Sequence, residues 1–106
     1  MPNRIANHTP VTASGAVSAV GNDFVFVGIV MALTSTGNND YAAVRIYDGS
    51  DATGTLVGVA EVWQETQDHH RGEDIDLPHG IACTSGCYAE IITESSATFK
   101  CTLLYY

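Results

Sequence analysis

Short apolar segments alternate with turn segments along most of this 106-residue chain. The apolar segments are rich in Val, Ile, Thr, Tyr and Phe, which favour strands, and helical periodicity is nearly absent. We predict strands at residues 11–20, 23–34, 41–47, 55–64, 73–77, 86–93 and 97–105. Because no helix is available for a parallel crossover, this series predicts an all-β fold, an antiparallel β-sandwich or jelly-roll-like arrangement of about seven to eight strands.

Turn residues separate these segments. Gly21-Asn22 is typical of a tight hairpin turn, and residues 37–40 and 48–51 are rich in Gly, Asn and Asp. Pro78 has no backbone N–H to donate, so Pro78-His79-Gly80 predicts the end of the fifth strand. No repeat or linker divides the chain. Its length fits one domain, residues 1–106, with residues 1–10 as a candidate N-terminal arm.

The last two predicted strands allow a register to be derived. We expect a hairpin with the loop Glu94-Ser95-Ser96, because this register gathers apolar residues on one face and pairs Glu90 with Lys100 on the other. Cys87 and Cys101 are then diagonal neighbours, about 7–8 Å apart, too far for an unstrained disulfide. The register therefore predicts that all three cysteines are free thiols. The apolar face of this hairpin consists of Cys87, Ala89, Ile91, Phe99, Cys101 and Leu103.

The segment 24–33 is apolar on both faces of its predicted strand. The outer face of a sandwich is normally polar, so one of these two faces needs a cover beyond the core. We expect the cover to be either the N-terminal segment or a neighbouring subunit, because exposed apolar patches usually mark interfaces. Trp63 and Tyr106 are amphipathic aromatic residues that also suit an interface. The candidate assembly surface is therefore Phe24, Phe26, Ile29, Met31, Trp63 and Tyr106.

Acidic residues dominate the charge of the chain. Twelve Asp and Glu oppose four Lys and Arg, which gives a formal net charge of -8 at pH 7. This charge repels phosphate backbones and anionic membrane surfaces, so we expect neither nucleic acid nor a membrane as a partner. The longest apolar run has ten residues, whereas a membrane-spanning helix needs about 20. The start shows no apolar signal segment, and three cysteines suit a reducing cytoplasm.

Two clusters contain metal-ligating residue types. His69-His70 precedes three carboxylates within residues 73–76, but adjacent imidazoles on a strand point to opposite faces. Asp48 and Asp51 flank a turn without the ligand order of an EF-hand, so we interpret this turn as stabilised by Asx hydrogen bonds. No Ser or Cys lies in the motif of a catalytic nucleophile. We therefore expect no enzyme activity and no cofactor, while a metal at either cluster is left open.

Three segments together resemble a known family. Residues 45–56 read RIYDGSDATGTL, residues 78–81 and 86–91 read PHGI and GCYAEI, and the chain ends in TLLYY. This order resembles the small β-sandwich virion proteins of tailed bacteriophages, over about residues 40 to 106. The resemblance implies a non-enzymatic structural protein of the virion, foremost a capsid decoration (cement) subunit, or else a neck or tail component. Its partners would be the major capsid protein and copies of itself, assembled in the host cytoplasm.

Two other classes of function stay open. A carbohydrate-binding module would use Trp63, Tyr41 or Tyr47 as an aromatic platform for sugar rings. A small hydrolase or isomerase on a jelly roll would need a ligand set that the sequence does not supply. The acidic composition fits a place on the outside of a shell, away from packaged DNA.

Overall fold

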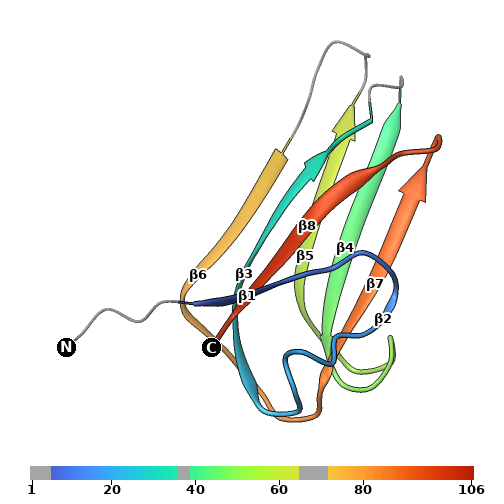
Figure 1. The fold of residues 1–106 in the computed structure, drawn as a ribbon. Coiled ribbons are helices and arrows are strands. Elements are labelled where there is room, and N and C mark those ends of the chain that lie inside the picture. Colours follow the sequence, from blue (N-terminus) through green and yellow to red (C-terminus); the bar gives the residue numbers. More distant parts are fainter. Residues whose placement is uncertain (1–5, 36–38, 65–71) are drawn as a thin grey trace.

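Eight strands and no helix are found in residues 6–35, 39–64 and 72–106, the parts of the chain that the computed structural model describes. All strand pairs are antiparallel, in two four-stranded sheets with the orders β1-β8-β3-β6 and β2-β7-β4-β5, which form the two layers of a sandwich (Figure 1). The predicted antiparallel β-sandwich is confirmed, while jelly-roll connectivity stays a prediction. The strands are β1 (Asn7–Pro10), β2 (Gly15–Ala16), β3 (Phe24–Leu33), β4 (Asp40–Asp48), β5 (Thr55–Gln64), β6 (Gly72–Cys83), β7 (Cys87–Glu94) and β8 (Phe99–Tyr105).

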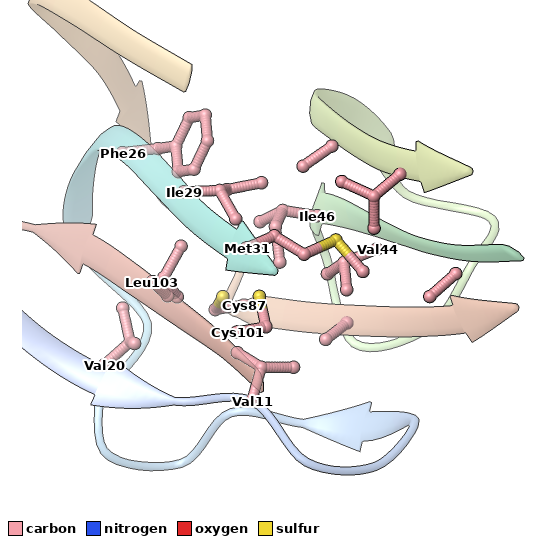
Figure 2. Close-up of a cluster of buried hydrophobic side chains, with 14 of the residues drawn as sticks. Val11, Val20, Phe26, Ile29, Met31, Val44, Ile46, Cys87, Cys101 and Leu103 are labelled. Carbon is pink, nitrogen blue, oxygen red and sulfur yellow. The ribbon is translucent and has the colours of Figure 1, made fainter. Parts of the chain in front are cut away.

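The core lies between the two sheets. Strand alternation turns Val44 and Ile46 of β4 inward. There they meet side chains of the other sheet, among them Ile29, Met31 and Leu103 (Figure 2). Each of these five residues exposes 1% or less of its surface. Full burial of one such side chain contributes about 1.5–3 kcal/mol, so this layer is a major source of the stability of the fold.

A β-bulge in β3 changes which of its residues face the core. Phe26 lies opposite Tyr105 of β8, but the next pair joins Gly28 to Leu104, so Val27 is an extra residue in β3. The pairing with β6 shifts at the same place, from Phe26–Ile81 to Gly28–Asp76. A bulge of one residue reverses the alternation of side chains beyond it. The inward residues of β3 are therefore Phe24 and Phe26 before the bulge, and Ile29, Met31 and Leu33 after it.

This bulge overturns most of the predicted assembly surface. Phe24, Phe26, Ile29 and Met31 are all buried in the core, and none exposes more than 5% of its surface. The prediction assumed uninterrupted alternation, which would place Phe26 and Ile29 on opposite faces of the strand. Because the bulge puts both on the inner face, these four residues belong to the core and are not available to a partner.

The outward residues of β3 are covered only in part. Gly80 of β6 lies directly against Val25 and Val27, since a Cβ at Gly80 would be 2.4 Å from Val25 Cγ1 and 3.1 Å from Val27 Cγ1. A segment of β6 therefore covers these two valines, which explains why the strand is apolar on both faces. Beyond the bulge, Val30 points outward and is 44% exposed.

The N-terminal part of the chain forms no single strand at residues 11–20, contrary to the prediction. β1 pairs with β8 in one sheet, whereas the two-residue β2 pairs with β7 in the other. The chain between β1 and β3 therefore passes from sheet to sheet, and Val11 and Val20 bury their side chains in the core on this side (Figure 2). Residues 12–16 are Thr, Ala, Ser and Gly, which offer little apolar surface to hold a strand in register. Of the candidate arm, residues 7–10 form β1, and residues 1–5 lie outside the described part.

The predicted C-terminal hairpin is wrong. β7 pairs with β2 and β4, whereas β8 pairs with β1 and β3, so the chain changes sheets at Ser95 and Ser96, both with positive φ. Glu90 lies opposite Arg45 instead of Lys100. Alternation indicates which residues face the core but not which strand lies alongside. It therefore could not distinguish a hairpin from two strands that face each other across the sandwich.

The inward residues of these two strands are nevertheless those that the pattern predicted. Cys87 and Ala89 of β7 are buried, as are Cys101 and Leu103 of β8, and the two pairs belong to the same core cluster from opposite sheets. Cys83, at the end of β6, is buried as well. All three cysteines are free thiols, as the sequence predicted.

The strand β6 continues through Pro78, where the prediction ended a strand. It can do so because β6 is the edge of its sheet and has a partner strand on one side only. The missing N–H of a proline therefore removes no hydrogen bond to a second strand. The ladder with β3 still lapses between Asp76 and Ile81, so the Pro78-His79-Gly80 tripeptide interrupts the pairing. The His69-His70 pair lies outside the described residues.

Candidate binding face

The outer face of the sheet β2-β7-β4-β5 gathers most of the exposed aromatic and apolar residues. Because Val44 and Ile46 of β4 point inward, their neighbours in the strand point outward, and the registers place residues of β5 and β7 beside them. We call this surface the aromatic face. It consists of Tyr41, Ala43, Arg45 and Tyr47 of β4, Leu56, Val59, Glu61 and Trp63 of β5, and Tyr88, Glu90, Ile92 and Glu94 of β7. Ala43 and Tyr47 are themselves buried, with 1% and 9% of their surfaces exposed.

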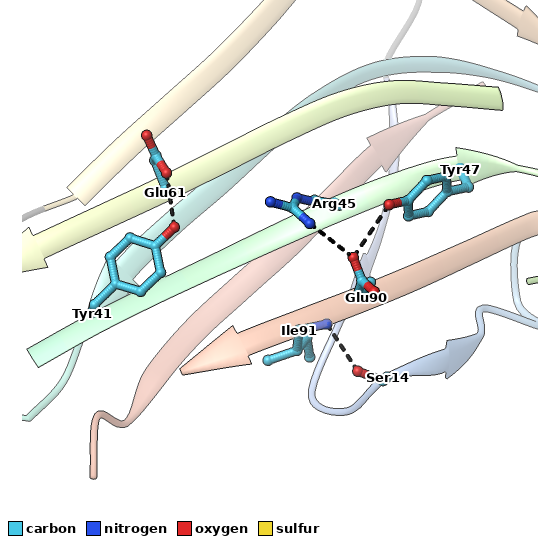
Figure 3. Close-up of polar contacts among 7 residues, drawn as sticks. All are labelled: Ser14, Tyr41, Arg45, Tyr47, Glu61, Glu90 and Ile91. Atoms are coloured by element: carbon cyan, nitrogen blue, oxygen red, sulfur yellow. Dashed lines mark hydrogen bonds and ion pairs between the residues drawn. The ribbon is translucent and has the colours of Figure 1, made fainter. Parts of the chain in front are cut away.

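One end of the aromatic face is held together by a polar network. Arg45 Nη1 donates to Glu90 Oε1 at 3.2 Å, and the Tyr47 hydroxyl donates to the same carboxylate oxygen at 3.2 Å (Figure 3). The hydrogen bond to Glu90 raises the pKa of Arg45. The rings of Tyr47 and Tyr88 lie opposite each other, 6.4 Å between centroids and tilted by 58°, a favourable aromatic arrangement. These contacts fix the orientation of the side chains rather than adding much stability, since exposed ion pairs contribute about 0–1 kcal/mol.

The other end of the face carries the single tryptophan. Trp63 is 47% exposed and lies directly opposite Tyr41 across the β4–β5 ladder. The Tyr41 hydroxyl donates to Glu61 Oε2 at 2.8 Å, which raises the pKa of Tyr41 (Figure 3). An indole, a phenol and a carboxylate thus stand side by side on one face of the sheet. This set can stack on an apolar surface and accept hydrogen bonds at its margin.

The strand β5 supplies much of the exposed apolar surface. Among the described residues, the large hydrophobic residues that are clearly exposed include Leu56, Val59 and Trp63, with 48%, 38% and 47% of their surfaces in contact with solvent. All three lie on the aromatic face. Trp63 was predicted from its residue type, whereas Leu56 and Val59 were not. Val59 shares the face of Trp63 by simple alternation within the strand 55–64, so the pattern could have indicated it. Contiguous exposed apolar surface of this kind is typical of an interaction site.

The remaining assembly candidate lies elsewhere. Tyr106 follows β8 and is half-buried, and its backbone N and O pair with O and N of Val25 at 2.9 and 3.0 Å. It therefore extends the other sheet, and the structure does not bring it together with Trp63. Tyr41 and Tyr47, proposed as alternative sugar platforms, do share the aromatic face with Trp63, but Tyr47 is buried and exposes only 9% of its surface.

The Asp48–Asp51 turn is stabilised by side-chain hydrogen bonds to backbone donors. Asp48 Oδ1 accepts the backbone N–H groups of Thr84 and Ser85 at 3.1 and 2.8 Å. Asp51 Oδ1 accepts the hydroxyl and the backbone N–H of Thr53, and these bonds lower the pKa of Asp51. This agrees with the interpretation as an Asx-stabilised turn. Within the described residues, no group of three or more His, Cys, Asp and Glu is placed to hold a metal ion.

Comparison of the chain with protein-family models, with curated proteins and with solved structures finds no match. Within the described parts of the chain, no helix is long and apolar enough to cross a membrane. The aromatic face and the sequence resemblance are therefore the two features that indicate a function.

Proposed function

We propose that the chain is a non-enzymatic structural protein of a tailed-phage virion, a capsid decoration subunit that binds the major capsid protein through the aromatic face. The observation that carries this proposal is the exposed row Leu56, Val59 and Trp63 beside the tyrosines of β4 and β7. Trp, Tyr and Arg are the residues that most often dominate binding energy in protein interfaces, and this face contains all three. The resemblance of residues 40–106 to phage virion proteins names the class of partner.

The proposed mechanism is burial of flat apolar surface, repeated at every symmetry-related position of the shell. A standard specific interface buries about 800 Å² on each partner. Weaker contacts can still hold a shell together when many are made at once, because linked binding events reinforce one another. The acidic chain would keep the outer side of the shell solvated and away from the packaged DNA.

A pair of variants tests the attachment. Trp63→Ala removes the exposed indole from the aromatic face, and Val30→Ala removes a similarly exposed residue from the outer face of the other sheet. We expect Trp63→Ala to weaken binding to particles lacking this subunit by about tenfold or more, as loss of an interface hot spot does. Val30→Ala should bind like the unmodified chain. A larger loss of affinity in Val30→Ala than in Trp63→Ala would contradict the proposed surface. Unchanged affinity in both variants would contradict it as well.

A carbohydrate-binding module is the second candidate, because Trp63, Tyr41 and Glu61 form one platform. The C–H faces of a pyranose ring can stack on the indole, and its hydroxyls can donate to the carboxylate. Binding of an uncharged glycan by the purified chain, lost in Trp63→Ala and kept in Val30→Ala, would favour this function over attachment to a shell. Retention on the neck or tail of the particle would favour a neck or tail component instead.

A further inference from the structure

The end of the aromatic face that contains Trp63 combines exposed aromatic surface with carboxylates. Tyr41 lies opposite Trp63 of β5 on one side and opposite Glu94 of β7 on the other. Glu61 is two residues from Trp63 on the same face of β5, and its Oε2 accepts the Tyr41 hydroxyl (Figure 3). Trp63, Glu61 and Glu94 are exposed, and Tyr41 is half-buried. Two neighbouring aromatic side chains and two carboxylates therefore share this end of the face.

The described side chains at this end are negatively charged. Arg45 is the only Lys or Arg among the residues of the aromatic face, and it is bonded to Glu90. The pKa of Tyr41 is raised, first by its hydrogen bond to Glu61, then by burial and by the charge of Glu61, and Glu94 adds to the rise against an opposing effect of Arg45. The whole chain has a net charge of -8. Charge complementarity therefore favours a cationic group of a partner at this end.

The aromatic rings determine which kind of cation fits. The face of an aromatic ring attracts a cation within about 6 Å of its centre, and an indole does so most strongly. A guanidinium is planar, so it can stack on a ring and donate to a carboxylate at the same time. An ammonium group is more strongly hydrated and has no plane to stack. The pair of Trp63 and Tyr41 beside Glu61 and Glu94 therefore suits an arginine better than a lysine.

We propose that Trp63 and Tyr41 form a subsite for an arginine side chain of the partner protein, which stacks on the indole and donates to the carboxylates of Glu61 and Glu94. This inference rests on the proposed function, since it names the chemistry of the capsid-protein surface that the aromatic face binds. An ionised carboxylate has about four acceptor positions, so Glu61 can hold the Tyr41 hydroxyl and still accept from an arginine.

The single tryptophan of the chain provides the readout, because a guanidinium stacked on Trp63 changes its fluorescence. The probe is an acetylated tetra-arginine amide, titrated into the isolated full-length chain, and the tetra-lysine peptide is a control of equal charge. We expect a saturable change of the Trp63 emission with tetra-arginine and a dissociation constant at least about twofold lower than for tetra-lysine. Equal constants for the two peptides would overturn the proposal, because a general attraction to an acidic chain does not distinguish them.

Matched double variants separate the subsite from the overall charge. Glu61→Gln/Glu94→Gln removes the two carboxylates beside the aromatic pair. Asp74→Asn/Asp76→Asn removes two exposed carboxylates from the outer face of the other sheet, so both variants change the net charge equally. The first should raise the dissociation constant of tetra-arginine by about twofold or more, and the second by a clearly smaller factor. Equal effects would contradict a subsite on the aromatic face.

Calorimetry measures the contribution of the indole itself. Trp63→Ala should raise the dissociation constant of tetra-arginine by about two- to fivefold, as the loss of an exposed cation–aromatic contact does. Val30→Ala, with a comparably exposed valine on the other sheet, should leave the constant unchanged. Unchanged binding in Trp63→Ala would overturn the proposal.

A sugar is the other occupant that this end of the face would take. A change of the Trp63 emission with maltohexaose, and none with tetra-arginine, would overturn the proposal in favour of the carbohydrate-binding module. All these measurements use the isolated chain and synthetic probes. Their failure is therefore distinct from a failure to bind a phage particle, which the apolar residues of β5 can support without an arginine.

Discussion

At the scale of single residues, burial determines the chemistry of the three cysteines. Removal from water raises the pKa of the Cys87 thiol to about 12 and that of Cys101 to about 11, because a thiolate is poorly solvated in the core. Burial raises the pKa of Cys83 too. The thiolate is the reactive form, so these residues act as small apolar side chains that pack the core and not as nucleophiles.

The first prediction concerns thiol reactivity. In the folded protein near neutral pH, a water-soluble disulfide reagent should react slowly with all three cysteines, since they are buried and protonated. In denaturant without reductant, the same reagent should find three thiols per chain. A count of one would mean that two cysteines are joined, which contradicts the structure.

The second prediction concerns stability at high pH. An unfolded thiol has a pKa near 9.0, below the folded values of about 12 for Cys87 and about 11 for Cys101. Their contribution to stability is therefore complete below pH 9 and is lost as pH rises toward 11, because only the unfolded chain releases these protons. The free energy of unfolding should fall by up to about 1.4 kcal/mol per pH unit for each thiol in this range. Urea midpoints at pH 8 and at about pH 10.5 measure the fall, and the double variant Cys87→Ala/Cys101→Ala should show a smaller one.

At the scale of elements, the bulge in β3 decides which substitutions damage the fold. Phe26→Ala and Ile29→Ala lie on opposite sides of the bulge, yet both remove core side chains. We expect losses of about 3–5 and 2–5 kcal/mol in the free energy of unfolding, as for other large-to-small core changes. Val30→Ala, one residue on, should change it by no more than about 0.5 kcal/mol. Chemical denaturation of the three variants checks this, and a mild effect of either core change would contradict the bulge.

Much of the strand series could be predicted from sequence, because alternation and turn residues act locally. The prediction of 55–64 matches β5, and most of β3, β4 and β7 was predicted. The bulge at Val27 was missed because it depends on how β3 pairs with β8 and β6, which are segments far from it in the chain. The hairpin of the last two strands was predicted from their matching apolar faces. This match cannot decide the pairing, because two apolar faces fit equally well in neighbouring strands or across a core.

The candidate site was predicted in part. Trp63, Tyr41 and Tyr47 were named for their residue types, and the β4–β5 register then placed them on one face. Leu56 and Val59 were missed because apolar residues in a strand suggest core unless the edge position is known. Phe24, Phe26, Ile29 and Met31 of β3 were assigned to a surface because a strand without a bulge would turn one of its two apolar faces outward. The composition of the strand does not reveal the bulge.

At the scale of the whole molecule, one sheet provides the proposed contact, since its outer face would attach to the shell. The other sheet protects both of its edges and exposes fewer apolar residues, which suits the side turned toward solvent.

The most direct test of this account is an image of the phage particle with this chain located in it by cryo-electron microscopy. We expect copies of the chain at symmetry-related positions on the outside of the head, with the aromatic face against the major capsid protein. Chains found only at the neck or tail, or chains turned with Trp63 toward solvent and Val30 toward the shell, would contradict it.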